Sequence, residues 1–355
     1  MTEGAEEEKS ESTLTVLVAL GANFLIAVLK LIAGIITGSG AMLAEAGHSV
    51  ADTFTEGLLL TALRRSGKPA DRAHPFGYGK ERYFWSLMAA VSIFTSGALF
   101  AFYEGFRTIF GEPEEQTNPL VGYLVLALAF ALEGTSWLRA VRQLRAEAAA
   151  EKRTVRTYLS LIDDPTVKTV FYEDSAALVG ILLAFGGIAL HDVTGQSVWD
   201  GVASVLIGVL LAGVAYLLGR TNLGLLIGRQ ADPAVVRGAR EMLAATPEVE
   251  VVVDLLTMVT GTDRILMCAR LDFVDDLTSS DLEIACVRIA GELTERYPDL
   301  DEIFLEPVPR SDPDLRARVL ARYGPRAGSL SSKPEGEGGR VDHGLAGQDG
   351  PVEDG

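Results

Sequence analysis

The stretch AEAGHSVADTFTEG places His48, Asp52 and Glu56 at intervals of four residues. In an α-helix this spacing puts the three side chains on one face. An imidazole and a carboxylate one helical turn apart supply half of a tetrahedral site for a divalent ion such as zinc. The alternative interpretation of His48 and Asp52 is a hydrogen-bonded pair that joins two helices.

A second acidic pair, Glu173 and Asp174, lies in another apolar stretch and would complete the site if the two stretches pack together. Ionisable residues inside membrane-spanning segments are expensive and usually mark an ion path or a proton relay. We therefore expect His48, Asp52, Glu173 and Asp174 to bind a metal ion. The alternative for Glu173 and Asp174 is a helix that begins later and leaves both carboxylates at the wet interface.

Three further residues are candidates for accessory roles. Glu56 extends the His48 face and would line an entry path or pair with a loop arginine. Asp71 and His74, three residues apart in KPADRAHPFGYGKERYF, would bind a second metal ion, although this proline- and glycine-containing loop also fits a simple turn. Lys30, inside the first apolar stretch, is expected to partner a carboxylate in the interior.

The composition predicts a membrane protein. The chain is 48 % hydrophobic and 22 % charged, and its mean hydropathy is +0.24. The charges collect in loops and in the C-terminal third, whereas apolar runs of about 20 residues, long enough to cross a bilayer, fill most of the first 220 residues. Six spans are predicted: Leu14–Thr37, Ala41–Leu63, Tyr83–Phe110, Pro119–Leu138, Thr166–Leu190 and Val198–Leu218.

The basic residues predict an orientation in the membrane. Lysines and arginines follow the second, fourth and sixth spans, whereas the connections GSG, GEPEEQTNP and HDVTGQS contain neither. By the positive-inside rule both termini are cytoplasmic in a multi-pass protein of the cell membrane. Residues 1–13 form an acidic tail, so we expect no cleaved signal peptide.

The pattern changes after the sixth span. Residues 229–312 predict a helix, two strands, a helix and a strand, and residues 323–355 are expected to be disordered. The predicted fold class is an α-helical membrane protein: a six-helix transmembrane domain (14–222) followed by a small cytoplasmic α+β domain. Cys268 and Cys286 have no CxxC spacing, and with a net charge of −17 no basic surface for nucleic acid is evident, so we expect no nucleic-acid partner.

These features together resemble the cation diffusion facilitator family, over roughly residues 14–312. The wording of AEAGHSVADTFTEGLLL, HPFGYGKERYFWSL, EDSAALVGILLA and WDGVASVLIGVLL is similar to the zinc transporter nine branch. The resemblance implies a homodimeric, proton-coupled exporter of divalent cations, without an enzymatic activity or a cofactor. It also implies that the C-terminal domain is a dimerisation domain.

The resemblance places the transport site in the second and fifth spans. It carries over to His48 and Asp52, and to Asp174, which is aligned by the glycine six residues later. The first position of the fifth span falls on Val170, which cannot bind a metal, and Glu173 is the replacement. Three carboxylates beside one imidazole shift the preference from zinc towards manganese or ferrous iron.

The regulatory metal positions also differ from the family pattern. Tyr78 stands where the loop would carry a second histidine, and the C-terminal domain contains no histidine. We expect a proton-coupled transporter that exports zinc, with manganese or iron as the second choice. The alternatives are a non-transporting, membrane-anchored metal sensor or scaffold, and an intramembrane hydrolase, for which no HExxH pattern is present.

Overall fold

A computed structural model describes residues 20–21, 23–111 and 118–323. The predicted acidic tail and all but the first residue of the predicted disordered tail lie outside these residues. The described helices of the first part of the chain are Asn23–Thr37, α2 (Gly40–Ser66), α3 (Glu81–Ser92), the π-helical η1 (Ile93–Ala98), α4 (Leu99–Phe110), α5 (Pro119–Ala150), α6 (Val155–Leu161), α7 (Pro165–Thr194) and α8 (Val198–Ile227).

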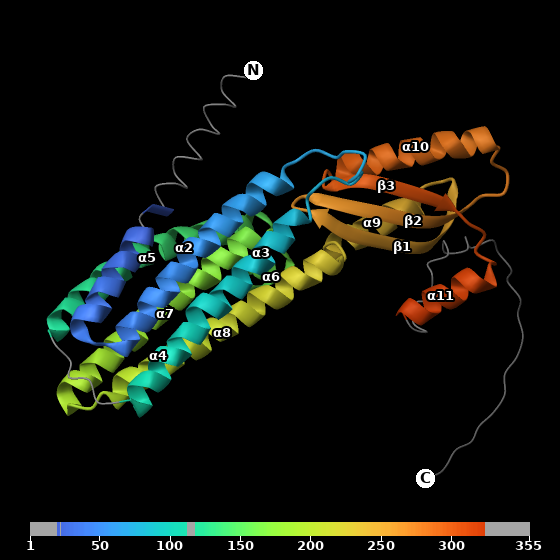
Figure 1. Ribbon diagram of the computed structural model, residues 1–355. Coiled ribbons are helices and arrows are strands. Elements are labelled where there is room, and N and C mark those ends of the chain that lie inside the picture. The colour runs from blue at the N-terminus through green and yellow to red at the C-terminus, as the bar shows by residue number, and fades with distance from the viewer. Residues whose placement is uncertain (1–19, 22, 112–117, 324–355) are drawn as a thin grey trace, which may run out of the picture. The chain divides into compact units, whose positions relative to one another are not determined.

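The long helices run alongside one another as a bundle (Figure 1). Within the described residues, four of them are long and apolar enough to cross a membrane: Glu81–Phe110, α5, α7 and α8. Helix Asn23–Thr37 is shorter in its described part, and α2 carries several ionisable residues that lower its hydropathy. Four of the six predicted spans are therefore confirmed by length and composition.

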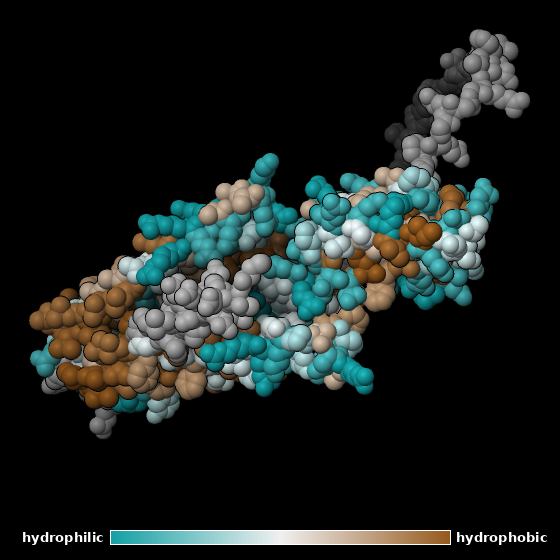
Figure 2. Space-filling model, turned by 90° about the horizontal axis from the view of Figure 1, so that it is seen from above, coloured by the Kyte–Doolittle hydropathy of each residue, from teal (hydrophilic) through white to brown (hydrophobic). Residues whose placement is uncertain are grey.

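Apolar side chains gather on the outer surface of the bundle (Figure 2). Phe94, Leu124, Leu182 and Val209 are each more than two-fifths exposed. Exposed apolar area on this scale is costly in water and favourable in lipid. The bundle is that of a membrane protein.

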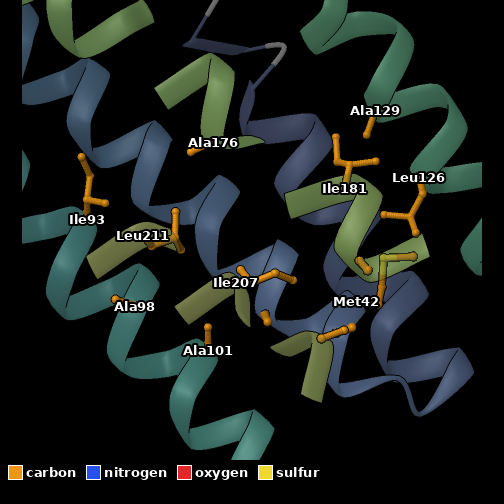
Figure 3. Close-up of a cluster of buried hydrophobic side chains, with 14 of the residues drawn as sticks. Met42, Ile93, Ala98, Ala101, Leu126, Ala129, Ala176, Ile181, Ile207 and Leu211 are labelled. Atoms are coloured by element: carbon orange, nitrogen blue, oxygen red, sulfur yellow. The ribbon is translucent and has the colours of Figure 1, made fainter. Parts of the chain in front are cut away.

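Small and medium-sized side chains fill the bundle interior. Figure 3 shows Met42 of α2, Leu126 of α5 and Ile181 of α7 gathered in one buried cluster, with alanines between the helices. Small residues let helices approach closely, which is how helix packing is stabilised in a membrane. This packing brings α2 against both α7 and α8.

Two helices extend well beyond their predicted ends. Helix α5 continues to Ala150 rather than Leu138, and α8 continues to Ile227 rather than Leu218. The extension of α5 consists largely of good helix formers such as alanine, leucine, glutamate and arginine, so that helix outlasts its apolar run, whereas the extension of α8 also contains two glycines, a threonine and an asparagine. Hydropathy marked the part of each helix suited to lipid and missed the remainder.

The C-terminal part forms α9 (Pro233–Ala245), β1 (Val249–Gly261), β2 (Arg264–Phe273), α10 (Ser279–Arg296), β3 (Leu300–Pro307) and α11 (Pro313–Tyr323). The first five elements confirm the predicted order of helix, two strands, helix and strand. In the described residues the strands form one sheet in the order β1-β2-β3. Strand β3 runs parallel to β2, because Ile265 donates to the carbonyl of Asp299 and Val308 donates to that of Leu271.

Helix α11 was not predicted, because its sequence is rich in charge. Leu315 and Val319 on one of its faces pack against Val251 and Val253 of β1. The chain divides into two compact units. One contains the described residues to 235 together with 257–267 and 297–302, and the other contains 236–256, 268–296 and the described residues from 303 onward.

Candidate metal site

The start of α2 is fixed by a buried polar cluster. Ser39 caps the helix, since its Oγ accepts a hydrogen bond from the backbone N–H of Met42 at 3.1 Å and donates one to Oδ1 of Asp200 at 2.8 Å. The other oxygen of Asp200 accepts from the N–H of Ala41 at 3.3 Å. Asp200 belongs to the first turn of α8, so this cluster sets the position of α2 against α8.

His48 and Asp52 lie one turn apart on α2, as the spacing predicts. Nδ1 of His48 is 3.3 Å from Oδ1 of Asp52, and their side chains are 1 % and 16 % exposed. Among the described residues, neither ring nitrogen of His48 has a hydrogen-bond partner, and Oδ1 of Asp52 also lacks one. A buried polar atom without a partner loses its hydration without compensation. Both residues therefore have ligand atoms available for a cation.

A cavity of about 360 Å³ adjoins these residues and joins α2, α5 and α7. It is lined by five acidic side chains and one basic side chain: Asp52, Glu56, Glu133, Glu173, Asp174 and Arg139. His48 is buried beside Asp52 and is not among the lining residues. Carboxylates that outnumber bases in a partly enclosed space attract cations.

Glu173 and Asp174 come from the third turn of α7. The helix begins at Pro165, capped by Asp164, whose Oδ1 accepts from the N–H of Thr166 at 2.8 Å. This early start carries both carboxylates into the bundle, and Glu173 is 7 % exposed. The carboxylate of Glu173 lies close enough to that of Asp52 for the two to repel one another. The structure thus brings the acidic residues of the second and fifth predicted spans to one cavity.

The cavity is not a closed coordination shell. Within the described part of the chain, no three His, Cys, Asp or Glu side chains lie close enough together to hold a metal ion. Single oxygens of Asp52, Glu173 and Asp174 are nevertheless buried without hydrogen-bond partners. The structure gathers the predicted ligands without bringing them to ligating distance from a common point.

Glu56 lines the same cavity, and one of its oxygens accepts a hydrogen bond from the side-chain amide of Asn23. Its partner is thus an asparagine of the first apolar helix and not a loop arginine. The second oxygen, Oε2, is buried without a partner. This geometry is compatible with a residue that lines the path to the metal ligands.

Lys30 belongs to a buried ion network whose other members the sequence did not identify. Nζ of Lys30, which is fully buried, donates to Oε2 of Glu45 at 3.0 Å, to Oγ of Ser49 at 2.9 Å and to Oε1 of Glu133 at 2.9 Å. Lys30 was expected to partner an interior carboxylate, and the structure identifies two. A lysine in an apolar stretch was the available signal, but the identity of its partners depends on how the helices pack.

Asp71 and His74 form a surface turn. Oδ1 of Asp71 accepts from the backbone N–H groups of Ala73 and His74 at 2.9 and 2.7 Å, and Oδ2 accepts from the hydroxyl of Tyr78 at 2.8 Å. The hydroxyl of Tyr78 and the backbone donors hold the pKa of Asp71 below its usual range. Both carboxylate oxygens are engaged in the turn, which favours the turn interpretation over a second metal site.

Comparison with known proteins identifies a family match in the N-terminal part of the chain. Residues 16–227 match the model of the cation efflux transmembrane domain. The chain is 33 % identical over 258 residues to the mitochondrial proton-coupled zinc antiporter SLC30A9 of Mus musculus, a match that covers 73 % of this chain and 45 % of the relative.

Two other relatives match at different lengths. Metal tolerance protein C4 of Arabidopsis thaliana is 32 % identical over 268 residues, covering 76 % of this chain and 58 % of the relative. The manganese efflux system protein MneP of Bacillus subtilis is 21 % identical over 307 residues, covering 85 % and 97 %. The chain spans about half the length of the first two relatives. Because the family model matches more than half of the sequence, the chain belongs to the cation efflux family.

Proposed function

We propose that this chain is a membrane transporter that exports a divalent cation from the cytoplasm in exchange for protons. The observation that carries the proposal is the cavity in which acidic residues of α2 and α7 meet beside the buried His48. Ligand atoms without hydrogen-bond partners inside an apolar bundle are expensive unless a cation or a proton binds them. His48, Asp52, Glu173 and Asp174 are the proposed ligands.

Zinc is the first choice for the transported ion. The imidazole of His48 favours zinc over calcium or magnesium, and the mouse relative is named a zinc antiporter. The excess of carboxylates at the cavity favours harder ions, and a Bacillus subtilis relative is named a manganese efflux protein. Manganese or ferrous iron is therefore the second choice.

The proposed transport step exchanges cation for protons at the same atoms. Carboxylates that repel one another cannot all stay ionised once the cation leaves, so protons replace it. The side chains of α2 and α7 are then exposed alternately to the two sides as the helices rock around the site. The incomplete coordination shell fits a site that must release its cation.

The finer membrane arrangement belongs to the same proposal. The first helix and α2 supply the two further spans, to give six, and the polar face of α2 points to the bundle interior rather than to lipid. The basic loops support cytoplasmic termini in the cell membrane. We further propose that the chain works as a homodimer through its C-terminal domain, as the family resemblance implies.

The test is metal uptake into proteoliposomes under a proton gradient, with zinc, manganese and iron compared. Wild type is expected to accumulate at least one ion, and Asp52→Asn is expected to abolish the flux. The matched control is Asp276→Asn, which removes a carboxylate from an exposed loop outside the cavity. A wild type that binds metal yet passes none under any gradient would overturn transport in favour of a membrane-anchored sensor.

A further inference from the structure

Glu133 of α5 belongs both to the cavity and to the Lys30 network. Its Oε1 accepts from Nζ of Lys30 at 2.9 Å, whereas its Oε2 is buried without a hydrogen-bond partner. The side chain is 12 % exposed and lines the cavity with Asp52 and Asp174. It lies close enough to both of those carboxylates to repel them. A cation in the cavity would therefore find a free oxygen of Glu133 beside the proposed ligands.

Glu45, the other acidic partner of Lys30, is placed differently. It is fully buried and is not among the residues that line the cavity. Its Oε1 lies over the backbone of α7 at Gly180, so closely that a Cβ on that glycine would clash with it. Glu45 is thus packed against the backbone of α7, whereas Glu133 opens onto the cavity.

We propose that Glu133 is a further cation ligand. It pairs with Lys30 when no cation is bound, and it leaves Lys30 to bind the cation when one enters the cavity. The inference rests on the proposed function and adds an internal counter-ion to it. Lys30 neutralises part of the carboxylate charge in the empty site, where uncompensated charge is costly. When Glu133 moves to the cation, Glu45 and Ser49 still pair with Lys30, so no buried ammonium is left alone.

Lys30 is consequently a competitor of the transported ion. Its positive charge attracts the carboxylate of Asp52. A change that strengthens the ion pair between Lys30 and Glu133 should weaken cation binding. A change that weakens this ion pair should strengthen cation binding. A purely structural ion network has no such effect on the affinity for the cation.

The experiment measures equilibrium zinc binding to purified protein in detergent. Glu133→Gln removes the proposed ligand charge and is expected to weaken binding about tenfold, equivalent to about 1.4 kcal/mol. Glu45→Gln leaves Glu133 as the acidic partner of Lys30, beside the hydroxyl of Ser49, and is also expected to weaken binding. The charge-balanced variant Lys30→Met/Glu45→Gln frees Glu133 and is expected to strengthen binding about tenfold. The opposite signs of the last two variants are the signature of competition.

Asp52→Asn and Asp276→Asn serve as the site and surface controls, and size-exclusion chromatography reports whether each variant is folded. Unchanged binding in Glu133→Gln, or binding in the folded charge-balanced variant no stronger than wild type, overturns the proposal. If that variant does not purify as a single species, Glu133→Gln alone decides. A wild type without zinc binding, or binding that survives Asp52→Asn, overturns the proposed function itself, which is a different result.

Discussion

Nδ1 of His48 lies 3.3 Å from Oδ1 of Asp52 without a hydrogen bond between them, although both atoms are buried. A structural pair that joins two helices would form hydrogen bonds through these atoms, and neither atom forms one. Both residues also belong to the same helix, so their contact ties no helix to another. The arrangement favours a pair of cation ligands over a structural link.

The nitrogen ligand should decide which ion is carried. Replacing His48 by aspartate leaves oxygen ligands only, which suit manganese better than zinc. His48→Asp is therefore expected to lower the ratio of zinc flux to manganese flux about tenfold or more. The measurement is paired uptake of both ions into the same proteoliposomes. An equal loss of both fluxes would show that His48 does not select the ion.

Glu173 should replace the ligand that Val170 cannot provide. Both residues line the cavity from adjacent turns of α7, so a carboxylate at either position faces the same space. Glu173→Gln is expected to lower zinc flux at least about tenfold, and Val170→Asp/Glu173→Gln is expected to recover part of it. Val179→Asp/Glu173→Gln is the control, because Val179 belongs to α7 but does not line the cavity. Recovery in the control, or none in the test variant, would contradict the assignment.

The C-terminal part of the fold followed from local pattern. Two apolar runs separated by the turn GTD predicted β1 and β2, and this turn contains Asp263 in a left-handed conformation at φ 54°. The order of helices and strands could be predicted because turn residues separate the apolar runs of the strands from the amphipathic helices. Helix α11 was not predicted, because only two apolar side chains, Leu315 and Val319, mark its buried face.

The site could be predicted only in part. The spacing of His48 and Asp52 on one helix is a local property, and the early start of α7 at Pro165 explains why Glu173 is buried. The role of Glu133 could not be predicted, because it depends on the packing of α5 beside α7 and on Lys30 of another helix. Partners distant in sequence are set by tertiary structure.

Asp163, in the connection between α6 and α7, should make stability depend on pH. Burial raises its pKa from 3.8 to about 6, against the attraction of Arg229. The folded state therefore binds this proton more tightly than the unfolded state, and the stabilisation is present below pH 3.8 and lost as the pH rises through about 6. Asp163→Asn should flatten the decline in thermal midpoint between these values and raise the midpoint at pH 7.5. Asp276→Asn, on an exposed loop, should follow wild type; an unchanged slope in Asp163→Asn would contradict the assignment.

The two cysteines should report the orientation. Cys268 and Cys286 belong to the C-terminal part, and burial raises the pKa of both thiols, so their alkylation should accelerate as the pH rises. With cytoplasmic termini, an impermeant maleimide should label them only after the cells are permeabilised. Asp192→Cys in a Cys268→Ser/Cys286→Ser background should be labelled in intact cells, since residue 192 lies in the last turn of α7, at the opposite end of the helix from Pro165. The reverse pattern would invert the orientation.

Gly180 should be required for stability, because the carboxylate of Glu45 packs directly against it. A Cβ at this position would clash with Oε1 of Glu45, a carboxylate already fixed by Lys30, so neither group has room to move. Gly180→Ala is expected to lower the free energy of unfolding by about 1–3 kcal/mol. Gly186, on the same helix, has no atom within 4 Å of the place that a Cβ would take, and Gly186→Ala should be neutral or stabilising by up to about 1 kcal/mol, because alanine favours the helix. Thermal midpoints in detergent compare the two. Equal midpoints would mean that Glu45 can leave Lys30 without cost, which contradicts the fixed role assigned to it beside the movable Glu133.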